Sequence, residues 1–366
     1  MSTENKPLIL LCAGGTGGHL FPAESLAHAL EKRGATIDLA TDHRTAQFKF
    51  PAREVHRIPS ATVRGKNPFA LARTALMLAR GTWKARSVIG RIKPAVVVGF
   101  GGYPTVPPLL AASMRGVPTV LHEQNSVMGR ANRLLASRVT HIATGFPTLK
   151  NADPALKAKM TFTGNPVRPA VLEAAKTPYA APGIDGPLNL LVFGGSQGAQ
   201  VMAEIVPPAI ERMSADVRAR LRIVQQARAE NIEAVRAAYA KLGVSVECAP
   251  FFSDLPARMA AAHLIVSRSG ASTVAELSAI GRPSILVPLP HALDQDQFHN
   301  AGALEQVGAA IRIVQKDFTP ERLCSEIVAL AGDPEQLSRM AATAKSVGTL
   351  DAAERLADLV MKTAGI

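Results

Sequence analysis

Cysteine and aromatic residues are both scarce in this chain of 366 residues. Its three cysteines, Cys12, Cys248 and Cys324, lie far apart and form no C-x-x-C pair. This spacing argues against a zinc site or a disulfide framework and is typical of a reducing compartment. Aromatic residues make up 4% of the chain, with one Trp and three Tyr, which leaves few rings to stack on nucleic-acid bases. No nucleic-acid-binding motif is recognisable either, so we expect no nucleic-acid partner.

The sequence also lacks a long uninterrupted hydrophobic run. The apolar stretch near the N-terminus covers only residues 8–13, which predicts no signal peptide. Residues 94–114 carry no charge, but prolines and glycines divide them, whereas a membrane-spanning helix needs about 20 mainly apolar residues. The length of 366 residues instead predicts two domains, and the 47% of hydrophobic residues is sufficient for each domain to bury a core.

Acidic residues are absent between Glu54 and Glu123, an interval that contains ten Lys and Arg residues. The formal net charge of +12 is therefore concentrated in residues 1–165, which carry +14, whereas residues 166–366 carry −2. Inside the interval, apolar and basic residues alternate at helical spacing over residues 67–91. Three interpretations compete: a core helix with a solvated basic face, a nucleic-acid contact, and a surface that docks on anionic lipid. Composition alone does not choose between them.

Short apolar strands alternate with helical segments along the chain. Residues 7–13 are typical of a buried strand, a glycine loop ends at His19, and residues 22–33 have helical periodicity. The same order recurs in the second half around a second glycine loop. The predicted strands are residues 7–13, 95–99, 118–121, 141–143, 188–193, 221–224, 244–248, 264–267 and 284–287.

This alternation predicts an α/β protein with two doubly wound, Rossmann-like domains of parallel strands facing a central cleft. We place the domains at residues 1–165 and 166–366, with a last helix that could pack back on the first domain. Ligands are expected at the carboxyl ends of the strands, where the glycine loops lie.

The glycine loops exclude several classes of nucleotide-binding protein. Neither loop spells G-x-G-x-x-G, which disfavours a nicotinamide dehydrogenase, and the chain has no Walker A motif. Residues 194–198 satisfy G-x-S-x-G, the nucleophile elbow of α/β-hydrolases. Asp294 and His299 follow in the order that hydrolases use, but they stand only five residues apart, whereas hydrolases carry these partners on separate loops. A hydrolase is therefore disfavoured, while binding of a diphosphate by backbone N–H groups stays open.

Seven motifs occur in the same order as in a known family. They are GGTGGH at 14–19, GGYP at 101–104, HEQN at 122–125, TGNPVR at 163–168, GGSQGA at 194–199, RSGASTVAE at 268–276 and D-x-x-Q-x-x-NA at 294–301. Together they resemble the MurG family, bacterial enzymes that add N-acetylglucosamine to lipid I to make lipid II, the peptidoglycan precursor. The resemblance implies a GT-B fold, a UDP-N-acetylglucosamine donor, an undecaprenyl-diphosphate acceptor and inversion at the anomeric carbon. It implies no cofactor and no required active-site metal.

The second half of the chain is implied to hold the donor. The turn at 270–273 leads into a helix, so its N–H groups and the Thr273 hydroxyl can face the UDP diphosphate. Glu276 is implied to accept hydrogen bonds from the ribose hydroxyls, although Ser272 or Thr273 followed by Glu is also a capping-box signature. The implied donor contacts besides Glu276 are Thr16, Gly17, Gly18, Asn125, Arg168, Ser196, Phe252, Gly270, Ala271, Ser272, Thr273, Gln297 and Asn300. Asp296 departs from the residues that many family members carry and is left without a role.

The first half is implied to hold the acceptor. Backbone N–H groups of the first glycine loop and of the GGYP motif would form two nests for the lipid diphosphate. The implied acceptor-binding residues are Gly14, Gly15, Gly101, Gly102 and Tyr103, with Thr16, Gly17 and Gly18 shared between the two substrates. Inversion needs a base that takes the proton from the 4-hydroxyl of the acceptor, and His19 titrates in the right range. His19 could instead bind phosphate or cap the helix, Glu123 is the rival base, and Asn125 is expected to orient a substrate.

The implied mechanism is a direct displacement in which UDP leaves, stabilised by the helix N-terminus, Arg168 and Thr273. With lipid I as the implied acceptor, lipid docking becomes the preferred interpretation of the basic segment, in which Phe69, Leu76 and Trp83 stand among arginines. We expect peripheral docking on the cytoplasmic face of a bacterial cell membrane. The alternatives are another GT-B sugar-nucleotide enzyme, with a different acceptor or with UDP-N-acetylglucosamine 2-epimerase activity, and a non-catalytic basic membrane-associated binding module.

Overall fold

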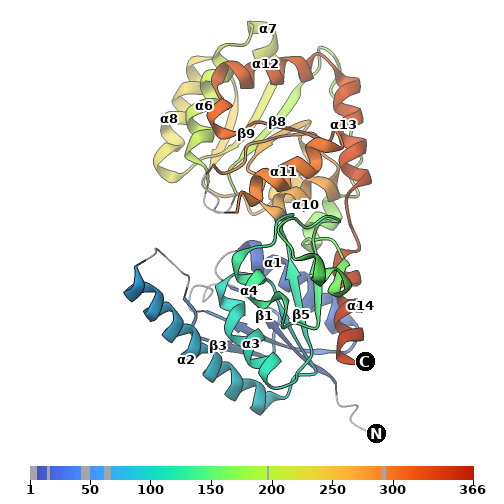
Figure 1. Ribbon diagram of the computed structural model, residues 1–366. Helices are drawn as coiled ribbons and strands as arrows, with labels where there is room; N and C mark the ends of the chain where they lie inside the picture. Colours follow the sequence, from blue (N-terminus) through green and yellow to red (C-terminus); the bar gives the residue numbers. More distant parts are fainter. Residues whose placement is uncertain (1–5, 15–16, 43–49, 62–66, 196–197, 291–293) are drawn as a thin grey trace. The chain divides into compact units, whose positions relative to one another are not determined.

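The computed structural model describes residues 6–14, 17–42, 50–61, 67–195, 198–290 and 294–366. These residues form two compact units, each built on one parallel sheet with helices on both faces (Figure 1). The first unit comprises residues up to Arg168 together with Thr349–Ile366, and the second comprises Pro169–Gly348. The predicted pair of doubly wound α/β sheets is confirmed. The first unit ends three residues later than the expected boundary and takes in the C-terminal helix.

The sheet of the first unit has seven parallel strands in the order β3-β2-β1-β4-β5-β6-β7. The strands are β1 (Leu8–Cys12), β2 (Thr36–Thr41), β3 (Glu54–Arg57), β4 (Val96–Gly99), β5 (Thr119–Glu123), β6 (His141–Thr144) and β7 (Met160–Phe162). The helices are α1 (Gly17–Lys32), α2 (Pro68–Ile92), η2 (Tyr103–Thr105), α3 (Val106–Met114), α4 (Arg130–Ala136), η3 (Pro154–Lys159) and α14 (Ala352–Ala364). Ile9 and Leu11 of β1 pack on one face in the core that α1 and α14 cover, whereas Leu10 and Cys12 pack on the other in the core that α2 and α3 cover. A central strand buried on both faces explains its continuous apolar sequence.

The C-terminal helix α14 packs against α1 of the first unit. Leu356, Ala357 and Val360 are buried in the core that this helix shares with α1. Arg33, which follows α1, forms an ion pair with Glu354 at 2.7 Å and a second with Asp358. The chain therefore crosses from one unit to the other twice, after Arg168 and after Gly348.

The sheet of the second unit has six parallel strands in the order β10-β9-β8-β11-β12-β13. The strands are β8 (Leu188–Phe193), β9 (Leu221–Gln226), β10 (Val246–Ala249), β11 (Leu264–Ser267), β12 (Ser284–Leu286) and β13 (Ala310–Arg312). The helices are α5 (Pro169–Ala174), α6 (Gln200–Glu211), α7 (Ala215–Arg220), η4 (Ala229–Asn231), α8 (Ile232–Lys241), α9 (Leu255–Ala261), α10 (Ala271–Ile280), α11 (Asp296–Gln306), η5 (Gln315–Asp317), α12 (Pro320–Ala331) and α13 (Pro334–Ser346). Its core joins alternate residues of β8, such as Leu188, Leu190 and Val192, to α6 and α12.

Helix α1 begins five residues earlier than the sequence pattern predicts. Proline is favoured at the first position of a helix, so Pro22 marked the expected start. In the structure Pro22 lies inside α1 and Gly17 is its first residue. Glycine is a poor helix former, which is why Gly17 and Gly18 gave no helical signal. His19 therefore lies in the first turn of a helix, whereas the glycine pattern predicts a position at the end of a loop.

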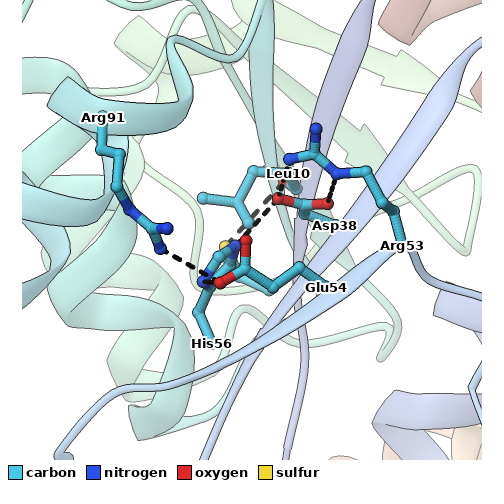
Figure 2. Close-up of polar contacts among 7 residues, drawn as sticks. Leu10, Asp38, Arg53, Glu54, His56 and Arg91 are labelled. Carbon is cyan, nitrogen blue, oxygen red and sulfur yellow. Dashed lines mark hydrogen bonds and ion pairs between the residues drawn. The ribbon is translucent and has the colours of Figure 1, made fainter.

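A buried carboxylate on β2 is the centre of an ion-pair network in the first unit (Figure 2). Asp38 accepts hydrogen bonds from Arg53 at 2.9 and 2.8 Å and lies 2.8 Å from Nε2 of His56. Burial opposes ionisation, but the bonds from Arg53 and His56 outweigh it and hold the pKa of Asp38 below its ordinary value. Glu54 extends the network, with 3.4 Å to Nδ1 of His56 and 3.1 Å to Arg91. Three potential metal ligands meet here, but the Arg53 guanidinium bonds to both carboxylate oxygens of Asp38, so the group is a salt-bridge network.

Replacing Asp38 should cost the first unit more stability than replacing the half-exposed Glu54. For Asp38→Asn we expect a loss of about 1–3 kcal/mol in urea unfolding at pH 7, because charge-assisted hydrogen bonds to buried groups are weakened. For Glu54→Gln, the matched control, we expect less than about 1 kcal/mol. Because the folded pKa of Asp38 is lowered, its contribution is present above the ordinary Asp pKa and disappears as the pH falls through the folded value. Equal losses in the two variants at pH 7 would contradict this assignment.

Candidate active site

The carboxylate of Glu123 holds the loop that follows β5. One of its oxygens accepts hydrogen bonds from the backbone and side-chain nitrogens of Asn125, at 2.9 and 3.3 Å. The other accepts from the backbone N–H of Gly129 at 2.9 Å and from the Asn132 amide at 2.6 Å. Burial raises the pKa of Glu123, although these four bonds favour its charged form. The carboxylate thus fixes the start of α4 and the backbone and side chain of Asn125.

His19 faces the same region from the first turn of α1. Its Nδ1 lies 3.1 Å from the side-chain oxygen of Gln124, the residue after Glu123. The other edge of the ring faces the loop after β4: a Cβ on Gly102 would lie 3.4 Å from Nε2, and one on Gly101 would lie 3.6 Å from Cε1. His19, Gln124 and this glycine pair therefore meet at the carboxyl ends of β1, β4 and β5.

The glycine pair after β4 adopts backbone conformations that other residues rarely reach. Gly101 has φ +82° and Gly102 has φ +72°, both in the region that glycine occupies without strain. The hydroxyl of Thr105 donates to the Gly102 carbonyl at 2.8 Å, and Tyr103 begins η2 directly afterwards. Gly14 is tightly packed, since a Cβ there would lie 3.1 Å from Pro104. Gly17 and Gly18 open α1, while Gly15 and Thr16, which were also expected in this site, lie outside the described residues.

The TGNPVR motif, which follows β7, anchors the HEQN motif at the end of β5, two strands away in the sheet. His122 Nε2 lies 3.1 Å from the carbonyl of Gly164, and the Asn165 amide donates to the backbone carbonyl of Gln124 at 2.8 Å. Burial lowers the pKa of His122 to about 4, so this ring is neutral at physiological pH. The guanidinium of Arg168, the last residue of the motif, lies 4.6 Å from the ring centre of Phe21 in α1.

In the second unit, a turn after β11 leads directly into helix α10. Arg268 is buried and donates to the carbonyls of Val287 and Pro288 and, at 2.6 Å, to the Gln315 side chain. Gly270 is the N-cap of α10 and makes no side-chain cap bond, and nothing lies within 4 Å of the position that a Cβ would take there. The first N–H groups of the helix, from Ala271, Ser272 and Thr273, thus follow an N-cap that has no side chain, and such a terminus suits an anion.

Ser269 couples the starts of α10 and α11. Its hydroxyl donates to the Gln297 carbonyl at 2.8 Å, and its own carbonyl accepts from the Asn300 amide at 3.3 Å. The Gln297 side chain accepts from the backbone N–H of Leu289 at 3.1 Å. Asn300 is completely buried, while Gln297 is partly accessible. The structure thus brings both predicted amides to the N-terminal side of α10.

Glu276 lies in the second turn of α10 and is buried. The helix starts at Ala271, with Gly270 as its N-cap, so Glu276 stands six positions after the cap and not three. The capping-box interpretation is therefore wrong, because that motif needs the acid at the third helical position. Phe252 is also buried, and the Arg258 guanidinium lies 4.3 Å from its ring centre. Ser196, the remaining predicted donor contact, lies outside the described residues.

Sequence reasoning missed three residues that organise these sites. Gln124 stands inside the HEQN motif, so the motif marked its position although not its role. Asn132 lies nine residues after Glu123, and no spacing rule connects them. Arg268 begins the RSGASTVAE motif, but a buried arginine bonded to carbonyls gives no signal in a sequence.

Two family models match most of the chain. The glycosyltransferase family 28 N-terminal domain matches residues 9–144, and the glycosyltransferase family 28 C-terminal domain matches residues 189–356. A relative from Rhodopseudomonas palustris (strain BisA53) is 61% identical over 99% of this chain and 98% of its own length. One from Nitrobacter hamburgensis is 60% identical over 98% of this chain and 97% of its own. Both bear the name UDP-N-acetylglucosamine–N-acetylmuramyl-(pentapeptide) pyrophosphoryl-undecaprenol N-acetylglucosamine transferase.

Solved structures show the same architecture. The crystal structure of Acinetobacter baumannii MurG aligns with a TM-score of 0.79 and 29% identity, covering 97% of this chain and 99% of that one. A UDP-GlcNAc 2-epimerase from Neisseria meningitidis aligns at 14% identity with a TM-score of 0.67, over 97% of this chain and all of that one, which is a likeness of fold alone. The chain is thus an enzyme of the glycosyltransferase class with the GT-B type of fold. It belongs to glycosyltransferase family 28, and the predicted resemblance to MurG is confirmed.

The contacts of Gly101 predict a local effect on activity. An Ala Cβ at Gly101 would crowd the Asn132 amide nitrogen at 3.2 Å and would only touch the His19 ring at 3.6 Å, at a φ of +82°. Gly116 is the matched control, because its φ is +70° and nothing lies within 4 Å of its added Cβ. Both Ala variants should lose about 1–2 kcal/mol of stability from backbone strain.

Only Gly101→Ala should also slow glycosyl transfer, by tenfold or more, because Asn132 must give way and its hydrogen bond to Glu123 is then disturbed. Steady-state kinetics and thermal unfolding of both variants test this. If the two variants kept the same activity, the glycine pair would have no part in shaping the site.

Proposed function

We propose that this chain transfers N-acetylglucosamine from UDP-N-acetylglucosamine to the 4-hydroxyl of the N-acetylmuramyl group of lipid I, with inversion, to form lipid II. The observation that carries the proposal is the 61% identity, over nearly the whole of both chains, to a relative that bears the name of this activity. The architecture of each unit, taken by itself, supports it, since each gathers polar groups at the carboxyl ends of its strands. Its substrates are UDP-N-acetylglucosamine and the undecaprenyl-diphosphate acceptor.

The donor half of the proposal rests on α10. Its N-terminal N–H groups and positive helix end would face the UDP diphosphate, with the Thr273 hydroxyl in the same turn. Glu276 is assigned to the ribose hydroxyls, because it stands too far from the N-cap Gly270 to act as a capping acid. Gln297, which is partly accessible beside this turn, is assigned to sugar hydroxyls. Asn300, also expected to contact the sugar, is completely buried and bonds to Ser269, so it is assigned to holding the turn.

The acceptor half assigns the general base to His19. Both oxygens of Glu123 already accept two hydrogen bonds each, so Glu123 is better suited to hold Asn125 and the loop than to take a proton. In the proposed reaction, Nε2 of His19 removes the proton of the 4-hydroxyl as that oxygen attacks the anomeric carbon. The bond from that carbon to the diphosphate oxygen breaks, and the electron pair leaves with UDP. The N-terminus of α10 and Arg168 would stabilise the charge that develops on the diphosphate.

Turnover of labelled UDP-N-acetylglucosamine with a lipid I analogue tests the activity. Formation of the disaccharide on the lipid, and none without acceptor, is the expected result. Conversion of the sugar nucleotide without acceptor would indicate an epimerase, and binding without turnover would indicate a non-catalytic module. Either result overturns the proposal.

In the same assay, His19→Ala should lower kcat by about 10²–10⁴-fold, the usual contribution of a general base. Its affinity for UDP should stay within about twofold of the wild-type value. His28→Ala is the matched control on the same helix, because His28 is half-exposed and its ion-pair partner among the described residues is the neighbouring Glu31, at 3.5 Å. The control should keep wild-type activity, and a nearly unchanged kcat in His19→Ala would eliminate the base assignment.

The proposed place of action is the surface of a membrane, where the acceptor is anchored. Among the described residues, no helix is both long enough and apolar enough to cross a bilayer. Helix α2 instead offers a surface: Phe69, Leu76 and Trp83 are 80%, 60% and 78% exposed and recur every seven residues, hence on one face. Arg73 and Arg80 lie between them on that face. The core-helix interpretation holds only for the end of α2, where Ala85 and Ile89 are buried.

Exposed aromatic and aliphatic side chains among basic residues suit an anionic lipid surface, which each nearby Lys or Arg favours by about 1 kcal/mol. This supports peripheral docking on the cytoplasmic face of the cell membrane. Charge reversal at Arg73, Arg80 and Lys84 should therefore weaken binding to anionic vesicles by tenfold or more. The matched control reverses three exposed cations of the second unit, Lys241, Lys316 and Arg339, and should bind as the wild type does.

Vesicle sedimentation with and without anionic lipid measures both triple variants. If binding did not depend on anionic lipid, or survived reversal on α2, the helix would be a solvated basic face and nothing more.

A further inference from the structure

The contact between His19 and Gln124 decides which nitrogen of His19 carries its proton. The side-chain oxygen of Gln124 is 3.1 Å from Nδ1, and an amide oxygen can only accept a hydrogen bond. Nδ1 must therefore carry the proton when the imidazole is neutral, and Nε2 then carries the lone pair. Because Nε2 lies on the edge of the ring that faces Gly102, the lone pair is on the side of the loop after β4.

Gln124 is held in place through the two residues that precede it, His122 and Glu123, and through its own backbone. Its carbonyl accepts from Asn165 at 2.8 Å, His122 before it bonds to Gly164, and Glu123 is fixed by four hydrogen bonds. The Gln124 side chain is buried, and among the described residues its amide nitrogen has no hydrogen-bond partner. A buried amide nitrogen without a hydrogen-bond partner costs about 1–3 kcal/mol of stability. The Gln124 side chain therefore does not serve stability alone at this position beside His19.

We propose that Gln124 is a positioning residue that sets the Nδ1–H tautomer of His19 and thereby makes Nε2 the proton acceptor. The inference rests on the proposed function, in which His19 is the general base. Rotation of the Gln124 amide by 180° would place its NH₂ group against Nδ1, put the imidazole proton on Nε2 and remove the base. One amide orientation is therefore compatible with catalysis and the other is not.

The titratable groups on the neighbouring elements do not take the place of Gln124 as the hydrogen-bond acceptor for Nδ1–H of His19. They are His122 and Glu123 of β5, Tyr103 of η2 and Arg168, which lies over the ring of Phe21, two residues after His19 in α1. His122 interacts electrostatically with His19 but is buried and neutral. Glu123 points its two oxygens at Asn125, Gly129 and Asn132, and Arg168 has no lone pair to offer. The described hydrogen-bond contact at the Nδ1 atom comes from the Gln124 amide oxygen.

Nitrogen-15 spectra of histidine-labelled enzyme test the tautomer without any turnover. His19 is assigned by the resonances that disappear in His19→Gln. Above the pH at which His19 ionises, wild type should show a protonated Nδ1 and an unprotonated Nε2. In Gln124→Met, which keeps the length of the side chain and removes the acceptor, the resonances should shift towards the Nε2–H form. A wild-type His19 in the Nε2–H form would overturn the proposal, whether or not the enzyme makes lipid II.

Kinetics separate positioning from a merely structural role. Gln124→Met should lower kcat about 10–100-fold, part of what a general base contributes, with the KM for UDP-N-acetylglucosamine within about twofold. Gln124→Glu restores an acceptor at Nδ1 and should recover activity at high pH. Its carboxylate favours the charged imidazolium, so the acidic limb of the pH profile should move up by about one unit or more. If Gln124→Met is unstable, the shifted limb of Gln124→Glu still decides the question.

Gln225 provides a matched buried amide in the second unit. It accepts from the Tyr239 hydroxyl at 2.6 Å and donates to the Met202 carbonyl at 3.3 Å. Gln225→Met should lower thermal stability and leave the pH profile of kcat unchanged. An unmoved profile in Gln124→Glu, or an equal shift in Gln225→Met, would show that Gln124 only supports the fold. Failure of wild type to turn over would instead refute the proposed function and leave the tautomer to the spectra.

Discussion

Every strand in both sheets runs parallel to its neighbours, and the location of the chemistry follows from this constraint. Each strand must end at the same edge of its sheet, so the segments after β1, β4 and β5 meet in one place, as do those after β11 and β12. Each helix that follows a strand begins at that edge with its positive end and its unused N–H groups. His19 comes from such a helix start, the glycine pair and Gln124 come from two strand ends, and α10 supplies the corresponding start in the second unit.

The polarity of α10 is reinforced at both of its ends. At the C-terminus, buried Arg282 donates to the carbonyls of Ile280 and Gly281, and Lys345 donates to that of Ala279 at 2.9 Å. Burial lowers the pKa of both cations, a desolvation cost that the bonded carbonyls and the negative helix end offset. At the N-terminus, Gly270 leaves no side chain over the first N–H groups. Cations thus lie at the negative C-terminal end of α10, and its positive N-terminal end is suited to a diphosphate.

The sequence was sufficient for most of the inner strands and the order of the motifs, and insufficient for β2, for three of the four edge strands and for contacts across long spacings. Strands such as β1 and β8 are buried on both faces, so their continuous apolar letters identify them. The edge strands β3, β7 and β13 are short and carry mixed residues, and they were not predicted. The inner strand β2 was not predicted either, because Thr36, Asp38 and Thr41 interrupt its apolar sequence. Glu123 and His19 were found through motifs, but their roles depend on Asn132 and Gln124, whose contacts arise only when the loops meet. The start of α1 was misplaced because two glycines concealed its first turn.

The charge asymmetry of the chain follows from where acids are available to pair with bases. In the second unit many arginines have carboxylate partners, such as Arg258 with Glu247 at 2.7 Å and Arg312 with Glu305 at 2.6 Å. On α2 the sequence supplies no acid, and only Arg91 at its end reaches back to Glu54. Arg73 and Arg80 have no ion pair with any other described residue. Exposed cations without partners keep their full attraction for an external anionic surface, whereas paired ones are largely neutralised. The absence of acidic residues, more than any added motif, therefore leaves α2 with unpaired positive charge. If acids stood between them, Phe69 and Trp83 would be ordinary exposed side chains.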